Sequence, residues 1–320
     1  MLALYRDISG RLEPVREEVF KSREFPKFEQ VMARFLEKKE SEQVTTICLG
    51  VAGAVKDGRS KTTNLPWVLD EQGLAKEFNV KKVRLLNDLE AAAYGMLFLA
   101  ENEMAVLNQG KDTDRKSNIA VIAAGTGLGE AMLYWNGREY LPAASEGGHA
   151  DFAPRSDQEI ELLRFLRSEF GHVSYERLLS GPGIFNIYRF LRDTGFAKEP
   201  DWLREKLQAN DPSATITQIG LARGHELCTE TLDLFASIYG AEAGNLALKF
   251  LTVGGVYIGG GIAPKILDKL KDGSFMRAFS DKGRYSDFLR QIPVKVALNS
   301  RAPLIGAAHY ALRLYGVETS

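Results

Sequence analysis

Short apolar runs that suit β-strands alternate with helical patterns in the first hundred residues. Residues 46–51 and 83–86 are short and apolar, as buried strands are, whereas the apolar side chains of residues 28–36 recur as on one face of a helix. Further helical patterns cover residues 69–78 and 89–99. Because strands that alternate with helices build a parallel sheet covered by those helices, this order predicts an α/β fold.

The flanks of this region add two more features. Strand candidates at 2–5 and 15–20 are joined by the turn-forming sequence Asp-Ile-Ser-Gly at 7–10. Residues 108–116 are polar and charged, which indicates a crossing between domains, and an apolar run at 119–124 then opens a second α/β region.

The second region combines a mostly helical insertion with further strands. The expected helices cover residues 160–170, 184–191, 201–207, 226–239 with an apolar continuation at 245–250, 265–270 with Pro264 in the first turn, and 304–314. The expected strands cover residues 253–258 and 294–298. We therefore expect a small α/β domain of residues 1–107 plus 303–320, and a large α/β domain of residues 108–302 that carries the helical insertion.

Composition argues against several classes of partner. The 41 basic and 42 acidic side chains leave a net charge of -1, without the excess that binds nucleic acid or an anionic membrane surface. The most apolar helix candidate, residues 91–100, is too short to span a bilayer. Cys48 and Cys228 lie in apolar runs, which indicates buried free thiols in a reducing compartment. We therefore expect a cytoplasmic protein that binds small molecules.

A Glu-Gly-Gly-His segment at 146–149 gathers a carboxylate, an imidazole and two glycines. The carboxylate of Glu146 suits two neighbouring hydroxyl groups, the imidazole of His149 can donate one hydrogen bond and accept another, and the glycines allow close approach of the backbone. This combination favours a polyhydroxylated ligand. The alternative is a polar loop with a structural histidine.

An amide and a carboxylate, Asn87 and Asp88, follow the strand at 83–86 and precede a helix. Ligands of open α/β sheets bind at the carboxyl ends of strands. Asp88 could take the proton of a hydroxyl group that attacks phosphorus, while Asn87 holds a neighbouring hydroxyl group. The alternative is that either residue simply caps the helix, which stabilises it by typically ~1 kcal/mol.

Two glycine clusters suit the phosphate and nucleoside parts of a nucleotide. The cluster at 124–129 lies between two strand-like segments and should form a tight hairpin whose amides and threonine hydroxyl face phosphate oxygens. It is not a Walker A loop, because no Gly-Lys-Ser/Thr follows. The cluster at 254–261 could let an adenosine lie against the backbone. The alternative for both is ordinary turn geometry.

The remaining polar candidates are one acid and three histidines. Glu176 lies at an expected helix start, where an acid is also favourable for the helix dipole. His172, His225 and His309 have no nearby carboxylate pair in the sequence and no metal-ligand spacing, so we expect packing or surface roles for them.

Taken in order, these segments resemble the bacterial glucokinase family of actin-like and hexokinase-like ATPases. The resemblance covers essentially the whole chain. Its motifs are residues 2–4, Asn-Leu-Pro-Trp at 64–67, Leu-Asn-Asp at 86–88, the glycine turn at 124–129, Glu-Gly-Gly-His at 146–149, Ser-Gly-Pro-Gly at 180–183 and the triple glycine at 259–261.

The resemblance implies two actin-like (ribonuclease H-like) α/β domains with the site in a cleft between them. It also implies transfer of the γ-phosphoryl group of ATP, with Mg²⁺, to the 6-hydroxyl of glucose, with Asp88 as the general base, in a homodimer. The positions that match sugar ligands are Asn64, Asn87, Asp88, Glu146, His149 and Glu176. The positions that match nucleotide ligands are Gly125, Thr126, Gly127 and Gly129 for the phosphates, and Gly259, Gly260 and Gly261 for adenosine.

Two features of related sugar kinases have no counterpart. No cysteine follows His149 before Cys228, which argues against the zinc-containing branch. The family also opens with a strand that carries Asp-x-Gly-Gly-Thr, whereas residues 2–5 match the strand that normally follows it, so we expect the first strand of the small domain to be missing. The explanations are a start codon placed too far downstream, which we favour, a truncation, or a natural remnant. The alternative function is therefore a catalytically impaired sugar-binding or regulatory module derived from a sugar kinase.

Overall fold

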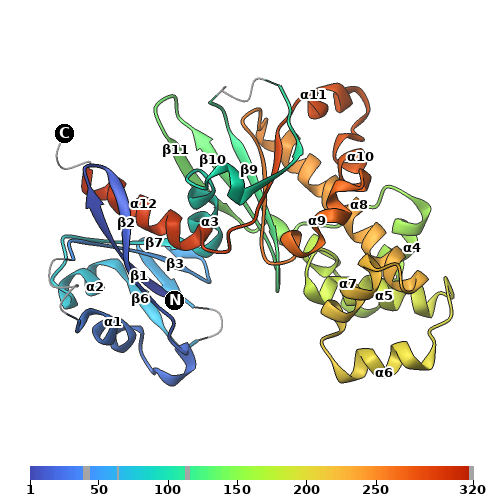
Figure 1. Cartoon of the computed structure of the whole chain (residues 1–320), viewed down its shortest axis with the longest axis horizontal. Helices are drawn as coiled ribbons and strands as arrows, with labels where there is room; N and C mark the ends of the chain where they lie inside the picture. Colours follow the sequence, from blue (N-terminus) through green and yellow to red (C-terminus); the bar gives the residue numbers. More distant parts are fainter. Residues whose placement is uncertain (39–43, 63–64, 112–115, 317–320) are drawn as a thin grey trace. The chain divides into compact units, whose positions relative to one another are not determined.

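The computed structural model of the chain describes residues 1–38, 44–62, 65–111 and 116–316. It divides into two compact units (Figure 1): unit 1 comprises Met1–Ala100 and Asn299–Ser320, and unit 2 comprises Glu101–Leu298. The expected boundaries lay at 107 and 303. Residues 101–107 group with unit 2 because the strand that contains most of them pairs in its sheet.

Unit 1 begins with an antiparallel hairpin of β1 (Leu2–Ile8) and β2 (Arg11–Glu18). The turn at Ser9 and Gly10 is left-handed, with φ of 54° and 85°, and the amide of Gly10 donates to Oδ1 of Asp7 at 2.7 Å. The predicted hairpin is therefore confirmed, but its first strand continues three residues beyond the predicted end, and its second strand covers Arg11–Glu18 rather than residues 15–20.

A second two-stranded sheet in unit 1 is parallel. It pairs β3 (Thr46–Val51) with β7 (Lys82–Asn87), with Val51 opposite Asn87. The other strands form a small antiparallel sheet of β4 (Val55–Lys56), β5 (Arg59–Lys61) and β6 (Val68–Asp70). The helices are η1 (Ser22–Glu24), α1 (Phe28–Leu36), α2 (Glu71–Glu77), α3 (Asp88–Met96) and α12 (Ala302–Gly316). The predicted bounds of α1 and β3 match those of the structure.

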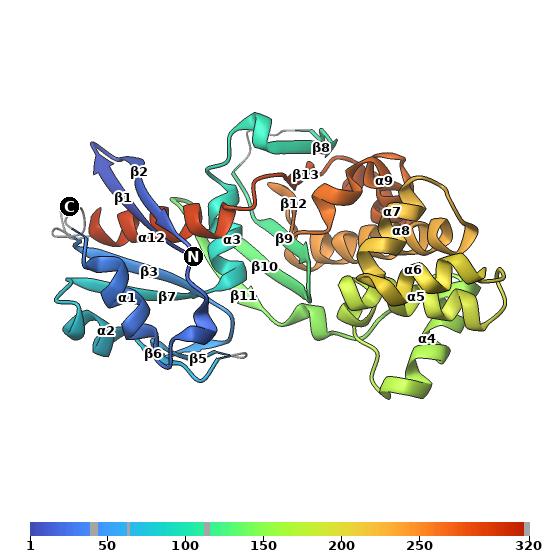
Figure 2. The same ribbon diagram turned by 60° about the horizontal axis from the view of Figure 1, so that its bottom comes forward.

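Helix α12 joins the two two-stranded sheets of unit 1, because it packs against β1, β3 and β7 (Figure 2). It also crosses α3 very closely. A Cβ atom at Gly95 would lie 1.8 Å from the carbonyl oxygen of Ala302, and one at Gly306 would lie 1.9 Å from that of Ala91. Only glycine at both positions permits this approach of the two backbones.

Unit 1 contains a cavity of about 910 Å³ lined mainly by side chains of β1, β3, α1 and α12. Its walls include Leu2, Leu4, Phe35, Ile47 and Leu49. Within the described residues, β1 pairs only with β2, and β3 pairs only with β7. One edge of β1 and one edge of β3 therefore have no neighbouring strand in this part of the chain.

Unit 2 is built on a six-stranded sheet in the order β11-β10-β9-β12-β13-β8. The strands are β8 (Met104–Asn108), β9 (Ile119–Ala124), β10 (Leu128–Trp135), β11 (Tyr140–Ser145), β12 (Gly255–Gly259) and β13 (Val294–Ala297). The central pairs β9–β12 and β12–β13 are parallel, and the remaining pairs are antiparallel. The parallel strands are almost entirely buried, as expected for strands covered on both faces.

The helices of unit 2 pack around a core that includes Tyr188, Phe235 and Phe275. They are η3 (Glu101–Glu103), η4 (Gly147–His149), α4 (Asp157–Phe170), η5 (Tyr175–Arg177), α5 (Gly181–Asp193), α6 (Asp201–Ala209), α7 (Pro212–Leu221), α8 (Glu226–Phe250), η6 (Ala263–Ile266), α9 (Leu267–Lys271), α10 (Ser274–Ser280), η7 (Gly283–Tyr285) and α11 (Ser286–Arg290). The sequence prediction missed α7, α10 and α11. Pro264 opens a 3₁₀ turn, and the α-helix begins only at Leu267.

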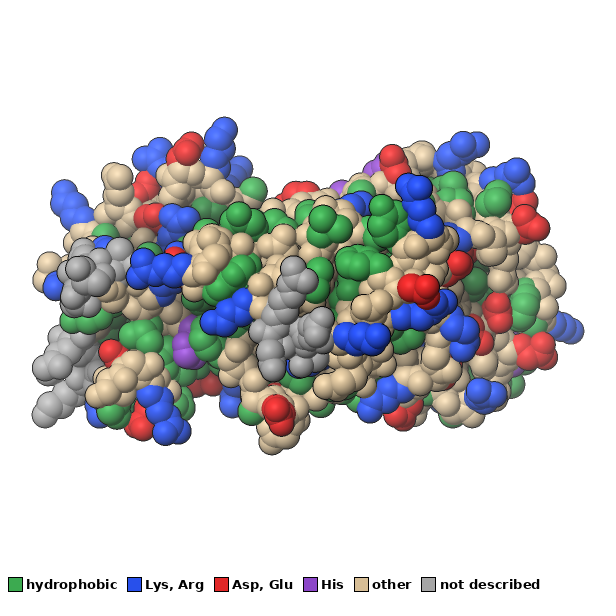
Figure 3. All heavy atoms as spheres, turned by 90° about the horizontal axis from the view of Figure 1, so that it is seen from above, with side chains coloured by type: hydrophobic (Ala, Val, Ile, Leu, Met, Phe, Trp, Pro, Cys, Tyr) green, Lys and Arg blue, Asp and Glu red, His purple; other side chains and the backbone are tan. Residues whose placement is uncertain are grey.

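Surface properties agree with the balanced composition. On the face drawn in Figure 3, acidic and basic side chains are interspersed. None of the helices in the described ranges is both long and apolar enough to cross a membrane. Both cysteines are free; Cys228 is buried and Cys48 is partly buried.

Candidate active site

Asn87 ends β7 and serves as the N-cap of α3. Its Oδ1 accepts from the amide of Leu89 at 2.9 Å, and its own amide donates to Oε2 of Glu90 at 2.8 Å, which completes a capping box. Its Nδ2 donates to the carbonyl oxygen of Gly53 at 3.2 Å. Asn87 therefore caps α3, and its hydrogen bond to Gly53 uses one of the two N–H groups of its side-chain amide.

Asp88 is the first residue of α3 and is exposed. Its Oδ1 accepts from the amide of Leu89 at 2.9 Å. Partial desolvation raises the pKa of the Asp88 carboxyl above its ordinary value, and hydrogen bonds from the amides of Leu89 and of Asp88 itself oppose that shift. An accessible carboxylate with a raised pKa is suited to accept a proton.

The first glycine cluster forms the predicted hairpin between β9 and β10. Ala124 lies opposite Leu128, and the amide of Gly125 donates to the carbonyl oxygen of Gly127 at 2.8 Å. Thr126 is exposed at the tip of this turn. The turn thus presents its hydroxyl group and backbone at the carboxyl end of β9.

The second glycine cluster lies directly beside the first. Strand β12 runs parallel to β9, with Gly259 opposite Ala123, and the amide of Ile262 donates to the carbonyl oxygen of Ala124 at 3.2 Å. Gly260 has φ of 81°, and a Cβ atom there would lie 2.1 Å from that carbonyl oxygen. Both clusters therefore meet at the carboxyl ends of adjacent parallel strands, where open α/β sheets bind ligands.

The Glu-Gly-Gly-His segment forms a short loop that includes η4 and packs on the start of β10. A Cβ atom at Gly148 would lie 2.1 Å from the carbonyl oxygen of Leu128, and one at Gly147 would lie 1.9 Å from Oε2 of Glu130. The side chains of Glu146 and His149, by contrast, are exposed. The two glycines thus pack the loop against the strand while the acid and the imidazole face outward.

Glu176 connects this loop to the glycine turn between β9 and β10. Its Oε2 accepts from the amide of Leu128 at 2.9 Å, and its Oε1 lies 4.0 Å from Nδ1 of His149. A Cβ atom at Gly127 would lie 2.4 Å from Oε2 of Glu176. A carboxylate, an imidazole and bare backbone therefore converge within unit 2.

The predicted site residues fall into two groups. Unit 2 brings together Glu146, His149, Glu176, Gly125, Thr126, Gly127, Gly129, Gly259, Gly260 and Gly261. Unit 1 holds Asn87 and Asp88 side by side at the end of β7. Asn64 lies outside the described residues.

Two further residues at this site were not predicted from the sequence to have a role. The amide of Gly181 donates to the carbonyl oxygen of Gly125 at 2.8 Å and so fixes the glycine turn to the start of α5. Glu130 is a buried acid on β10 beneath the loop at 146–149. Its sequence signal was an acid within an otherwise apolar strand.

His172 lies at the surface. Its Nε2 is 2.8 Å from Oδ1 of Asp151, a single carboxylate that is distant in the sequence, and both side chains are exposed. His225 caps α8 by accepting from the amide of Leu227, and His309 stacks on Phe98 with ring centroids 3.6 Å apart. The packing and surface roles expected for the latter two are confirmed.

Sequence comparisons identify the family. The sequence profile of the glucokinase family matches residues 1–314. The glucokinase of Trichormus variabilis is 41% identical in an alignment that covers 96% of this chain and 93% of that protein. The glucokinase of Synechocystis sp. is also 41% identical, in an alignment that covers 93% of this chain and 90% of that protein.

Structure comparisons agree. The crystal structure of a glucokinase from an Antarctic psychrotroph superimposes with a TM-score of 0.85 at 32% identity, over 97% of this chain and 94% of that one. A ROK family glucokinase from Streptomyces griseus, in complex with glucose and AMPPNP, shares the fold with a TM-score of 0.58 at 20% identity, over 96% and 94% of the two chains.

Together with the glycine turns and the acids around them, these likenesses define a sugar kinase with the actin-like ATPase fold. The chain belongs to the glucokinase family. Its activity is the ATP-dependent phosphorylation of glucose.

Proposed function

We propose that Asp88 is the general base that takes the proton of the glucose 6-hydroxyl as O6 attacks the γ-phosphorus of ATP. A bond forms between O6 and phosphorus, the bond from phosphorus to the bridging oxygen of ADP breaks, and Asp88 holds the proton. The observation that carries this role is an accessible carboxylate at the carboxyl end of β7 whose pKa is raised.

Glucose takes its other ligands from Asn87, Glu146, His149 and Glu176, and from Asn64 on the family resemblance alone. The exposed carboxylate of Glu146 can accept hydrogen bonds from two sugar hydroxyls, and the second side-chain N–H of Asn87 can donate one. His149 and Glu176 are supported as sugar ligands because Nδ1 of His149 lies 4.0 Å from Oε1 of Glu176 within unit 2. In this proposal the two units are the two actin-like domains.

The nucleotide binds at the paired glycine turns of unit 2. Gly125, Thr126, Gly127 and Gly129 take the phosphates, and Gly259, Gly260 and Gly261 take the adenosine. Adjacent parallel strands end at these turns, which supports the assignment.

Mg²⁺ accompanies ATP in this proposal and offsets charge on its phosphates. Mg²⁺ is usually held by substrate phosphates, water and one or two carboxylates rather than by a protein cage. The described part of the chain has no group of three or more His, Cys, Asp or Glu side chains that could hold a metal ion. A homodimer is also proposed, on the family resemblance alone.

The small-domain sheet takes one further strand, which carries the Asp-x-Gly-Gly-Thr loop, between β1 and β3. Three observations support this: both strands have an edge with no strand partner in the described chain, both pack on α12, and side chains from both line the cavity of about 910 Å³. Such a strand would pair with both edges and join the two sheets.

The test of Asp88 measures ADP release with glucose and Mg-ATP, beside glucose binding without ATP. Asp88→Asn should lower kcat by roughly 100- to 10,000-fold, the range for loss of a general base, and change glucose affinity little. The matched control is Asp201→Asn, which removes another exposed acid from the first position of a helix. Normal turnover in Asp88→Asn would remove this residue from the mechanism.

A further inference from the structure

Glu130 is a buried carboxyl group placed directly beneath the loop at 146–149. It lies on β10 between Ile122 of β9 and Ser145 of β11, and only 1% of its surface is exposed. Within the described ranges, its Oε1 has no hydrogen-bond partner. Its Oε2 occupies the space that a side chain at Gly147 would need. The backbone of the loop therefore rests on this carboxyl group.

The charged and titratable groups around Glu130 come from two other elements. Helix α8 supplies Glu242, which is fully buried, Lys249 and Tyr239, and η5 supplies Tyr175. Burial first, and the negative charge of Glu242 second, raise the pKa of Glu130 to about 7, while Lys249 acts in the opposite direction. Glu130 therefore changes charge near neutral pH.

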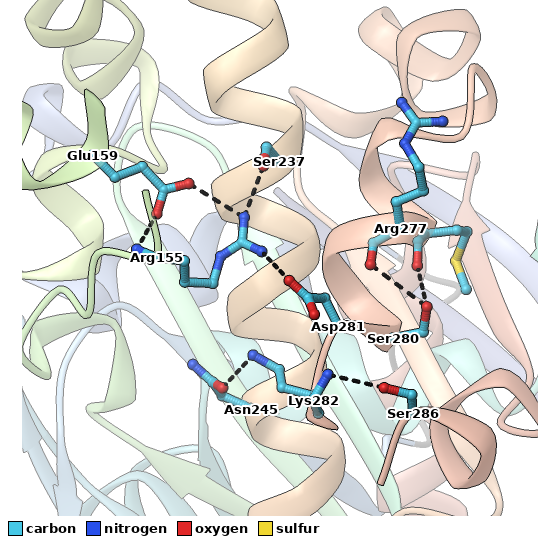
Figure 4. Close-up of polar contacts among 10 residues, drawn as sticks. Arg155, Glu159, Ser237, Asn245, Arg277, Ser280, Asp281, Lys282 and Ser286 are labelled. Atoms are coloured by element: carbon cyan, nitrogen blue, oxygen red, sulfur yellow. Dashed lines mark hydrogen bonds and ion pairs between the residues drawn. The ribbon is translucent and has the colours of Figure 1, made fainter. Parts of the chain in front are cut away.

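Glu242 belongs to a polar network that reaches η5, the element that carries Glu176. Nδ2 of Asn245 donates to Oε2 of Glu242 at 2.7 Å and to the hydroxyl of Tyr175 at 3.1 Å. Lys282 donates in turn to Oδ1 of Asn245 at 2.7 Å (Figure 4). Because Tyr175 belongs to η5 and immediately precedes Glu176, this network contacts the element that carries Glu176.

We propose that Glu130 is a positioning residue for glucose binding: its neutral carboxyl group supports the loop at 146–149, and its ionised form displaces that loop and weakens glucose binding. A buried carboxylate beside Glu242 with an unpaired oxygen is costly, and a loop position that admits water relieves that cost. The inference rests on the proposed role of Glu146, His149 and Glu176 as sugar ligands.

Calorimetric glucose titrations without ATP, between about pH 6 and 8.5, test this inference. The unsubstituted protein should lose glucose affinity with a midpoint near pH 7, by about fivefold or more, the lower end of coupling between linked sites. Glu130→Gln, which cannot ionise, should keep high affinity across the range. In steady-state assays the pH effect of Glu130 should appear in KM for glucose rather than in kcat.

A second variant keeps the test decisive if Glu130→Gln does not fold. Glu242→Gln leaves Glu130 in place but removes the neighbouring negative charge, so the midpoint should move to lower pH. Equal pH dependence in Glu130→Gln and the unsubstituted protein, or an unmoved midpoint in Glu242→Gln, would overturn the inference.

Failure of the underlying site assignment gives a different result. Glu146→Gln should weaken glucose binding at every pH, because a charge-assisted acceptor is lost. Unchanged affinity in Glu146→Gln would contradict the sugar site itself. Weakened affinity there, with no effect of Glu130→Gln on the pH profile, would overturn only the role of Glu130.

Discussion

Asn87 and Asp88 are neighbours in one turn but have different hydrogen-bonding states. The side-chain oxygen of Asn87 is used by the helix cap, whereas Asp88 is exposed and its Oδ1 accepts from the amide of Leu89. The capping role and the catalytic role were alternatives for this pair in the sequence. The structure supports the first for Asn87, and leaves an accessible carboxylate for the second at Asp88.

Two glycines of the same turn should respond differently to alanine. A methyl group at Gly127 would meet Oε2 of Glu176, whereas a methyl group at Gly125 would meet no other atom within 4 Å. Gly127→Ala should therefore displace Glu176 and raise KM for glucose more than KM for ATP. Gly125→Ala should instead crowd the phosphate position and raise KM for ATP.

Steady-state kinetics with each substrate varied in turn check this pair. An identical pattern for the two variants would contradict the separate roles given to the turn and to Glu176.

At the scale of single residues, the sequence identified candidate residues by their chemistry but did not predict their contacts. It singled out Glu146, His149 and the glycines because their chemistry suits a sugar. It did not show that Gly147 and Gly148 are required by contacts with β10, or that Glu176 accepts from Leu128, 48 positions earlier in the chain. Contacts between distant segments follow from tertiary packing, which local patterns do not contain.

Among the elements, the crossing of α3 and α12 is the most sensitive to side-chain size. Gly306→Val would force a bulky side chain against the carbonyl oxygen of Ala91. Overpacking of this kind should lower the free energy of unfolding by roughly 1–3 kcal/mol or more. Gly316→Val, at the open end of the same helix, is the matched control and should change it little.

Urea unfolding curves of the two variants give the comparison. Equal midpoints would show that the helices can move apart without cost.

One edge of β1 and one edge of β3 have no strand partner among the residues that the structure describes, and these edges allow a direct test of the proposed extra strand. A synthetic peptide in which valines and isoleucines precede Asp-x-Gly-Gly-Thr should pair with both edges. Hydrogen exchange of the amides in β1 and β3 should then slow, while a peptide of scrambled order should have no effect. Unchanged exchange with the ordered peptide would count against a strand between them.

Element prediction succeeded where the apolar periodicity was clear and missed short helices. The sequence predicted a helix at 226–239 that runs into an apolar stretch at 245–250, and the structure has one helix, α8, of 25 residues. Within it, Gly240 and Gly244 let α8 approach the carbonyl oxygens of Phe275 and Phe279 in α10. Helix α10 was missed because its seven residues are fewer than the window in which a helical period can be recognised.

For the whole chain, Glu130 links stability to pH. Its pKa is about 7 in the folded chain, above the ordinary value of 4.5. Between these values the folded chain keeps a proton that the unfolded chain has released, so the free energy of unfolding falls as pH rises through this window and stays lower above it. Glu130→Gln should therefore be more stable than the unsubstituted protein at about pH 8, by roughly 3 kcal/mol, and similar to it near pH 4.

Urea unfolding at the two pH values measures this difference. Glu161→Gln, an exposed substitution on α4, serves as the control and should show no such dependence. A stability difference that is the same at both pH values would contradict the assigned pKa shift.

Unit 1 is discontinuous in sequence, and this determines when it can fold during synthesis. Helix α12 packs on β1, β3 and α3, yet roughly 200 residues of unit 2 are translated between α3 and α12. At a typical 5–20 residues per second, the ribosome needs on the order of 10–40 s for that interval. Throughout it, the apolar faces of α3 and β3 lack their covering helix, so the nascent chain offers a binding surface to chaperones until its final helix emerges.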